Sequence, residues 1–245
     1  MSIEILALIF VSIGAGAICK GITGMGLPLI AIPVLANFLD VPHAIAITIV
    51  PSIVSNGWQA ISHRAHREAI DFLPRILVAS CIGIVIGTLF LKAAPGVLVF
   101  RALGVMLLAF VAIRLLRPNV GLSIDRARAI SAPAFLAAGA MQGAIGVAAP
   151  IVVTFLNAIR FDRPVYIFVI SLIYCSLAVI QMVSYAVAGL ITPVNLAESV
   201  FALIPVACLM PVGAMIGKRF DARMFDYAVL AVICLMAVRF LTIAA

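Results

Sequence analysis

Charged residues are scarce in this chain. Only 10% of its 245 residues are charged, whereas 66% are hydrophobic; a soluble domain carries about 25% charged residues. Because so few charges cannot cover a water-exposed surface, the composition excludes a soluble globular enzyme, a disordered chain and a coiled coil. It predicts an all-α polytopic membrane protein whose partner is the lipid bilayer.

Cysteine clusters and catalytic motifs are also missing. The five cysteines stand inside apolar runs, with no C-x-x-C spacing and no cluster of Cys and His. We interpret them as small packing residues and expect no disulfide, metal site or cofactor. Metalloprotease, serine-hydrolase and P-loop motifs are missing as well, so we expect that the protein is not an enzyme.

Acidic side chains are absent from the middle of the apolar runs. We expect all nine acids at segment ends or in loops: Glu4, Asp40, Glu68, Asp71, Asp125, Asp162, Glu198, Asp221 and Asp226. The histidines also stand near segment ends, where we expect interfacial positions. This pattern disfavours cation pumping and proton coupling through a carboxylate.

Six apolar runs have the length of a full membrane span. They cover about residues 43–62, 72–91, 97–116, 165–190, 195–217 and 224–244. Two further stretches, 3–38 and 129–159, would be about 54 and 46 Å long as straight helices, against a hydrocarbon core of about 30 Å. Because glycines interrupt each stretch, we expect two broken or re-entrant helix pairs and about ten helical segments in total. The expected arms are 3–19 with 25–38, and 129–142 with 147–159.

The net charge of +7 comes from 16 Lys and Arg against 9 Asp and Glu. We interpret the basic residues as topology signals in short loops and expect no nucleic-acid partner. If both long stretches enter and return, Lys92 and Arg101 lie on one side of the membrane. Twelve others lie on the opposite side: Arg64, Arg67, Arg75, Arg114, Arg117, Arg126, Arg128, Arg160, Arg163, Lys218, Arg219 and Arg223. Single crossings would split the same residues seven to seven, so the bias predicts cytoplasmic basic loops and both termini outside.

A pattern of Gly and Pro recurs in the two halves of the chain. Residues 21–30 align with residues 143–152 at an offset of 122, and Gln59 aligns with Gln181 at the same offset. Small-xxx-small pairs also recur, at Gly83 and Gly87 and at Gly213 and Gly217. Each half then holds an odd number of segments, so the second half must be inverted in the membrane.

This repeat predicts a division of the chain into three parts. We expect a first repeat at 1–117, a cytoplasmic connecting loop at 118–127 and a second, inverted repeat at 128–245. Inverted repeats with broken helices are typical of secondary transporters, whose substrate site lies between the breaks near the bilayer midplane.

The glycines at the two breaks are candidates for an anion site. The returning arms begin there, and a helix N-terminus attracts anions through its free N–H groups and its dipole. Glycine also lets a ligand approach the backbone closely. The alternative is that these glycines serve only close helix packing.

Polar residues near the breaks complete the candidate set. Asn56 and Gln59 belong to a polar stripe along 43–62, Gln181 lies on a similar face of 165–190, and Lys20 is the one cation near a break. The alternatives are interhelical hydrogen bonding for the amides and a snorkelling position for the lysine. The candidate substrate-binding residues are Lys20, Gly21, Thr23, Gly24, Gly26, Asn56, Gln59, Gly143, Gly146 and Gln181.

These motifs resemble those of the TauE/SafE family of sulfite exporters, over nearly the full chain. The carriers of the resemblance are the Gly21-x-Thr23-Gly24-x-Gly26-x-Pro28 element, its echo Gly143-x-x-Gly146-x-x-x-Pro150, and the two later glycine pairs. The resemblance implies export of sulfite or a small organosulfur anion across a bacterial inner membrane. The second element has Ala148 and Ala149 where members often have glycine, so the backbone there would be less approachable.

Two other functions are compatible with the sequence. One is a five-plus-five transporter of a different small metabolite, neutral or cationic. The other is an intramembrane enzyme, suggested only by the polar stripe. The oligomeric state is left open.

Overall fold

The computed structural model describes residues 2–65, 71–116, 121–217 and 222–242, and the elements in these ranges are α-helices. They are α1 (Ile3–Thr23), α2 (Leu27–Leu35), α3 (Val41–Ser62), α4 (Leu73–Ala93), α5 (Gly96–Leu116), α6 (Ile124–Ile145), α7 (Ala149–Ile159), α8 (Arg163–Ala188), α9 (Pro193–Phe201), α10 (Leu203–Gly217) and α11 (Ala222–Thr242). Ala202 alone separates α9 from α10. The predicted fold class, an all-α protein of about ten helical segments, is confirmed.

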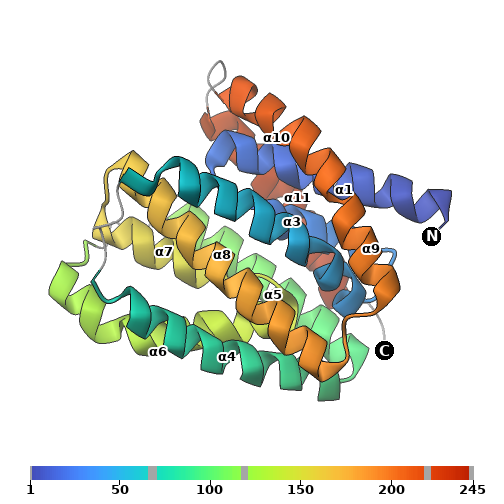
Figure 1. Cartoon of the computed structure of the whole chain (residues 1–245), viewed down its shortest axis with the longest axis horizontal. Coiled ribbons are helices and arrows are strands. Elements are labelled where there is room, and N and C mark those ends of the chain that lie inside the picture. The colour runs from blue at the N-terminus through green and yellow to red at the C-terminus, as the bar shows by residue number, and fades with distance from the viewer. Residues whose placement is uncertain (1, 66–70, 117–120, 218–221, 243–245) are drawn as a thin grey trace.

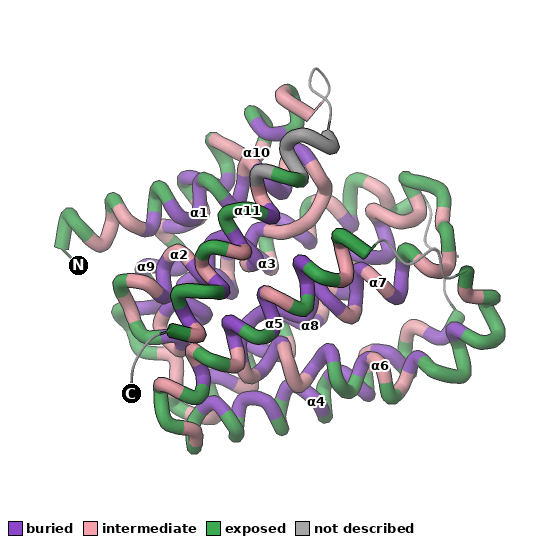
Figure 2. Tube along the Cα trace, turned by 180° about the vertical axis from the view of Figure 1, so that it is seen from behind, coloured by how far each residue is buried: buried purple, intermediate pink, exposed green. Residues whose placement is uncertain are grey.

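Six segments are long and apolar enough to cross a membrane: α1, α3, α4, α5, α8, and α9 together with α10. Large apolar side chains such as Val78, Ile86 and Val105 are exposed on outward faces. Figure 2 shows buried positions facing the middle of the bundle and exposed positions around its outside. This distribution suits a bundle whose outer surface contacts lipid, and the chain is a multi-pass membrane protein.

Both chain termini lie at the same end of the bundle (Figure 1). We call this the terminal end; α1, α3 and α9 begin there. At the opposite end, called the loop end, α3 ends, α4 and α6 begin, and α7 meets α8. Figures 1 and 2 agree that α2 lies toward the terminal end and α7 toward the loop end. The hairpin of α1 and α2 therefore opens toward one end and the hairpin of α6 and α7 toward the other.

The arms of each hairpin differ in length, which corrects the expected arms of similar size. Helix α1 has 21 residues and α2 has 9, while α6 has 22 and α7 has 11. The expected ends of the first arms were too early, because α1 continues to Thr23 rather than to residue 19 and α6 to Ile145 rather than to residue 142. The first arm ends only where a glycine takes a positive φ, at Gly24 (85°) and Gly146 (73°).

Glycines inside the helices let two pairs of helices touch at the backbone. An added Cβ at Gly83 or Gly87 of α4 would overlap a backbone carbonyl oxygen of α6, and one at Gly143 would overlap a carbonyl oxygen of α4. The same holds between α1 and α10, at Gly21 and Gly213. These contacts are small-residue helix crossings of the kind that occur in membranes.

The two crossings correspond when the halves of the chain are exchanged. Helices α1 and α6 are the long arms of the two hairpins, and each packs on the fourth segment of the other half, α10 or α4. Exchange of equivalent helices is what a repeat requires, but the predicted boundaries of the repeats stay a prediction. Helix α6 begins at Ile124, inside the range expected to be the loop 118–127, and residues 117–120 lie outside the described part.

Candidate functional site

The two helix breaks line one small cavity. Its volume is about 70 Å³, and residues from both breaks and from α3, α5, α8 and α11 surround it. The lining includes Thr23, Gly26, Gly146 and Ala148. A cavity of about 10–15 Å³ already holds one water molecule, so this cavity has room for a small ligand.

The first break is held open by its own backbone and by one hydroxyl. Gly24 caps α1 with φ 85°, and Gly26 precedes α2 with φ 101°, a region that favours glycine. Thr23 Oγ1 lies 2.7 Å from the Met25 carbonyl oxygen and 3.3 Å from the Met25 nitrogen. No side chain caps the N-terminus of α2, and Pro28 lies in its first turn. The first N–H groups of α2 therefore remain available to a ligand.

The second break packs against the first hairpin. An added Cβ at Gly146 would lie 2.5 Å from Ile32 Cδ1 of α2 and 2.8 Å from Ile45 Cγ1 of α3. Helix α7 begins after Ala148 with no side-chain cap, and Pro150 stands in its first turn. Each break thus presents a helix N-terminus at the same cavity, where a partial positive charge and free donors are expected.

Lys20 is buried beside the first break. Its side chain is 2% exposed and lines the cavity, and its ammonium group donates a hydrogen bond to Asn56 Oδ1. The Asn56 amide nitrogen in turn donates to the Ser52 carbonyl oxygen at 2.8 Å. Snorkelling to an interface is therefore wrong for Lys20. Ser52, part of the polar stripe but not a predicted site residue, also lines the cavity.

Gln142 occupies the matching place before the second break and was missed. It lines the cavity, donates to Gln181 Oε1 at 2.7 Å, and its carbonyl oxygen accepts from Gln181 Nε2 at 2.7 Å. The offset of 122 residues pairs Gln142 with Lys20, so the repeat contained the signal. Each half therefore has one polar side chain in the last turn of its long arm, hydrogen-bonded to the third helix of that half.

Five predicted site residues lie outside the cavity lining, and one of them, Gly24, caps the end of α1. Gln59 accepts a hydrogen bond from Ser171 at 3.3 Å, and Gln181 is engaged with Gln142. Gly21 and Gly143 lie in the helix crossings. These four residues take the packing and interhelical roles that were the alternatives; a role in binding stays a prediction for them.

A larger cavity adjoins the first on the side of the loop end. Its volume is about 620 Å³, and its lining includes Thr154, Asn157 and Arg160 of the α7 region. Phe110, Arg114 and Val153 line both cavities; Arg114 is the charged member of this shared set.

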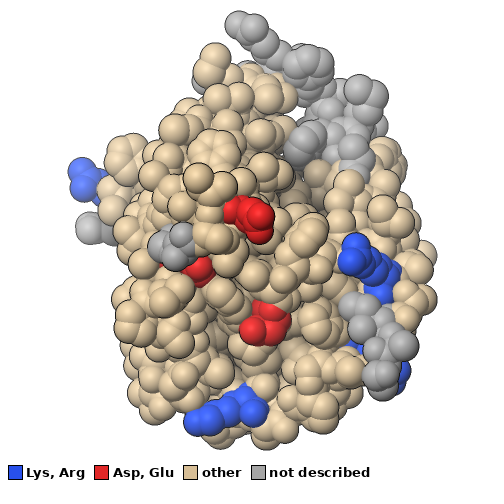
Figure 3. Space-filling model, turned by 90° about the vertical axis from the view of Figure 1, so that its right-hand side faces the viewer, with Lys and Arg blue, Asp and Glu red and all other residues tan. Residues whose placement is uncertain are grey.

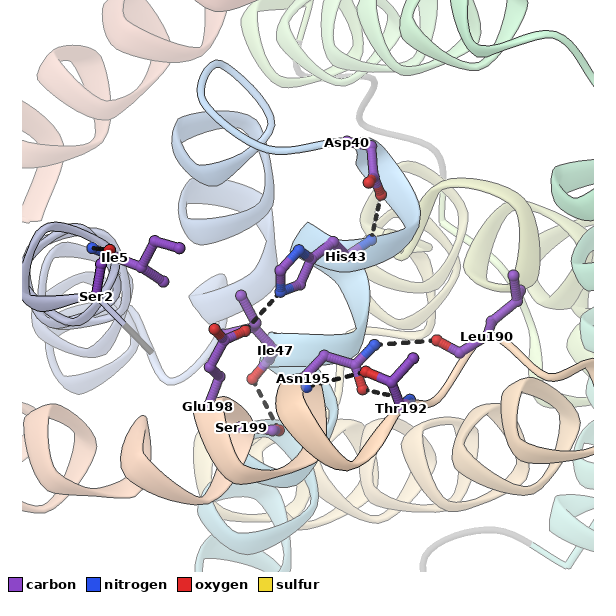
Figure 4. A network of polar contacts seen from close by, with 10 residues as sticks. All are labelled: Ser2, Ile5, Asp40, His43, Ile47, Leu190, Thr192, Asn195, Glu198 and Ser199. Carbon is purple, nitrogen blue, oxygen red and sulfur yellow. Dashed lines mark hydrogen bonds and ion pairs between the residues drawn. The ribbon is translucent and has the colours of Figure 1, made fainter.

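A second buried polar cluster lies at the terminal end, between α3 and α9 (Figure 4). Glu198 is 1% exposed, and its Oε2 lies 2.5 Å from His43 Nε2. Lys20 and Glu198 are the two buried charged residues in the described part of the chain. Glu198 lies near the end of its segment, as expected, but it is buried because α9 packs against α3.

Figure 3 views the terminal end. Asp and Glu side chains lie near the middle of this face, whereas Lys and Arg lie near its rim. Most of the charged surface described at the loop end is basic, including Arg114, Arg126, Arg128, Arg160 and Arg163. The two ends therefore differ in charge.

Opposed broken helices that enclose a cavity with a few polar side chains inside an apolar bundle define a class of protein, the membrane transporters built on discontinuous helices. Residues 8–240 match the family model described as sulfite exporter TauE/SafE, and the chain belongs to that family. The resemblance drawn from the glycine motifs is thereby confirmed. No match was found among curated proteins or among solved structures.

Proposed function

We propose that this protein exports sulfite, or a sulfur oxyanion of similar size, across a bacterial inner membrane by alternating access. The anion binds in the cavity between the two breaks. The observation that carries the proposal is a cavity lined by a buried lysine and by the N-termini of two helices. Family membership supports an anion exporter at the coarser level.

The donors around the cavity suit an oxyanion. An ammonium group has three N–H donors, and the Asn56 oxygen accepts from Lys20, which leaves donors for a ligand. The N-termini of α2 and α7 add backbone N–H groups. The described lining includes Lys20 and Arg114 and no acidic side chain. This balance disfavours a cationic metabolite, the rival transporter function, because a cation would meet only positive charge.

The volume of the cavity narrows the substrate class. A volume of about 70 Å³ has room for an anion as small as sulfite, and we therefore propose sulfite as the first substrate to test.

The larger cavity gives a direction to the path. It shares Phe110, Arg114 and Val153 with the lining of the break-lined cavity, and its own lining includes Arg160. If the basic loops face the cytoplasm, as the positive-inside rule favours, then substrate reaches the site from the cytoplasm and both termini are periplasmic. Arg114 is the charged residue that an anion entering from the larger cavity would pass just before it reaches Lys20.

Binding of sulfite to the purified protein tests the proposal. We expect sulfite to raise the melting temperature of the parent protein, because a ligand that binds only the folded state stabilises it. The change Lys20→Met should remove this shift, whereas Lys92→Met, an exposed lysine at the end of α4, should keep it. An equal shift in Lys20→Met would place the anion elsewhere.

A further inference from the structure

Glu198 and His43 form a pair that spans α3 and α9 at the terminal end. Glu198 is 1% exposed, whereas the side chain of His43 is 26% exposed. The carboxylate is therefore buried, and the imidazole that contacts it at 2.5 Å (Figure 4) is partly exposed. A buried carboxylate is costly unless a positive or proton-donating group accompanies it, and here that group is the partly exposed His43 imidazole.

Few other charges face the pair in the described part of the chain. On α3, the Asp40 carboxylate caps the helix by accepting from the His43 backbone N–H at 2.8 Å. Glu4 on α1 is exposed, α2 carries no titratable side chain, and α10 carries only the exposed thiol of Cys208 in its described range. On α8, the nearest titratable group in chain order is Tyr185, whose hydroxyl donates to the Gly143 carbonyl oxygen. No basic side chain other than His43 is paired with Glu198 in this part of the structure.

Ser199, the next residue of α9, replaces a hydrogen bond that is missing inside α3. Pro51 has no N–H, so the Ile47 carbonyl oxygen loses its partner within the helix. Ser199 Oγ donates to that oxygen at 2.9 Å and accepts from the Val50 N–H at 3.1 Å. Helix α9 is thus fixed to α3 at two adjacent points, one ionic and one at the proline.

The same helix carries residues of the anion cavity. Ser52 and Asn56 follow Pro51 on α3, and Asn56 holds Lys20. A movement of α9 away from α3 would release the segment of α3 before Pro51, and the proline provides a point at which α3 can bend. The pair at the terminal end is therefore mechanically connected to the lysine at the breaks.

We propose that the Glu198–His43 pair is a proton-binding site whose proton keeps the terminal end of the transporter closed. An imidazole changes charge between about pH 5 and 8. With one proton shared, the pair is neutral overall and α9 stays on α3. When the proton leaves to the solution at the terminal end, a net negative charge remains between the helices, and its desolvation cost favours separation of α9 from α3. Raising the pH on that side therefore opens the terminal end.

The inference rests on the proposed transport function only for the identity of the anion that would pass through the opened terminal end. Its test therefore needs no substrate. In a protein whose five native cysteines are replaced by serine, Ile47→Cys places one thiol at the residue of α3 whose carbonyl oxygen accepts from Ser199 of α9; Ile47 is fully buried. Labelling by a membrane-impermeant maleimide is measured from pH 5.5 to 8.5, and each rate is divided by the rate in the same background with Glu198→Gln, which cancels the titration of the thiol itself.

We expect the ratio to rise about tenfold with pH, which corresponds to about 1.4 kcal/mol between closed and open states. Adding His43→Gln should flatten the profile, whereas adding Glu4→Gln, a change of an exposed acid, should preserve it. A ratio that stays constant with pH in the parent would overturn the proton site. The melting temperatures of the variants show whether each is folded, and sulfite stabilisation of the parent, measured in parallel, reports separately on the proposed function.

Discussion

At the scale of single residues, Gly24 and Gly146 both end a helix with a positive φ but have different surroundings. An added Cβ at Gly24 would meet only Ile167 Cγ1 at 4.0 Å, whereas at Gly146 it would meet Ile32 and Ile45 within 3 Å. The backbone conformation constrains both positions. Side-chain packing between the two hairpins constrains only the second.

The change Gly24→Ala should cost about 1–2 kcal/mol through the left-handed backbone alone. Gly146→Ala should cost about 1–3 kcal/mol more, because the methyl group also overpacks the contact between the hairpins. Melting temperatures in detergent check this order. Gly96→Ala is the control, since nothing lies within 4 Å of its Cβ position and its φ is ordinary. Equal losses at Gly24 and Gly146 would contradict the packing account.

At the scale of elements, the sequence locates both breaks but not the ends of their helices. The sequence pattern places Gly21 and Gly143 in the breaks, yet both lie inside a helix. They are glycines because the backbone of another helix approaches too closely for a side chain. The approaching helices are α10 and α4, which are distant in sequence from the glycines they contact. For the same reason the burial of Glu198 could not be predicted. No local feature of the sequence indicates that the side of α9 that carries Glu198 packs onto α3.

The joint between α9 and α3 is an element-scale feature with its own test. Ser199→Ala should destabilise the protein by about 1–3 kcal/mol, because it leaves the Ile47 carbonyl oxygen buried without a partner. Ser176→Ala is a matched control, since its hydroxyl bonds to Leu172 within the same helix and removes no other partner. Thermal unfolding of both variants measures the difference. Equal stability of the two variants would contradict the claim that Ser199 stabilises α3 by bonding to the Ile47 carbonyl oxygen.

At the scale of the whole molecule, two hairpins enter the bundle from opposite ends and meet at one cavity (Figure 1). The repeat and the loop charges predicted that the two hairpins enter from opposite ends, because both can be recognised from residue types and their spacing alone. The sequence could not predict the pairing of Gln142 with Gln181 or the cavity volume, because both depend on how side chains of different helices pack.

The orientation of the molecule is tested by labelling single cysteines in intact cells. In a cysteine-free background, Gly96→Cys near the terminal end should react with an impermeant maleimide from outside. Arg126→Cys at the start of α6 should react only after the membrane is made permeable, because the basic loops face the cytoplasm. The reverse pattern would invert the proposed path.

Counterflow in proteoliposomes tests the central claim most directly, that Lys20 and the two breaks hold the transported anion. Vesicles loaded with unlabelled sulfite should accumulate labelled sulfite when they contain the parent protein or Lys92→Met. Lys20→Met should slow the accumulation about tenfold or more, the effect of losing at least about 1.4 kcal/mol of interaction. Accumulation at the parental rate in Lys20→Met, or none in the folded parent, would contradict the account.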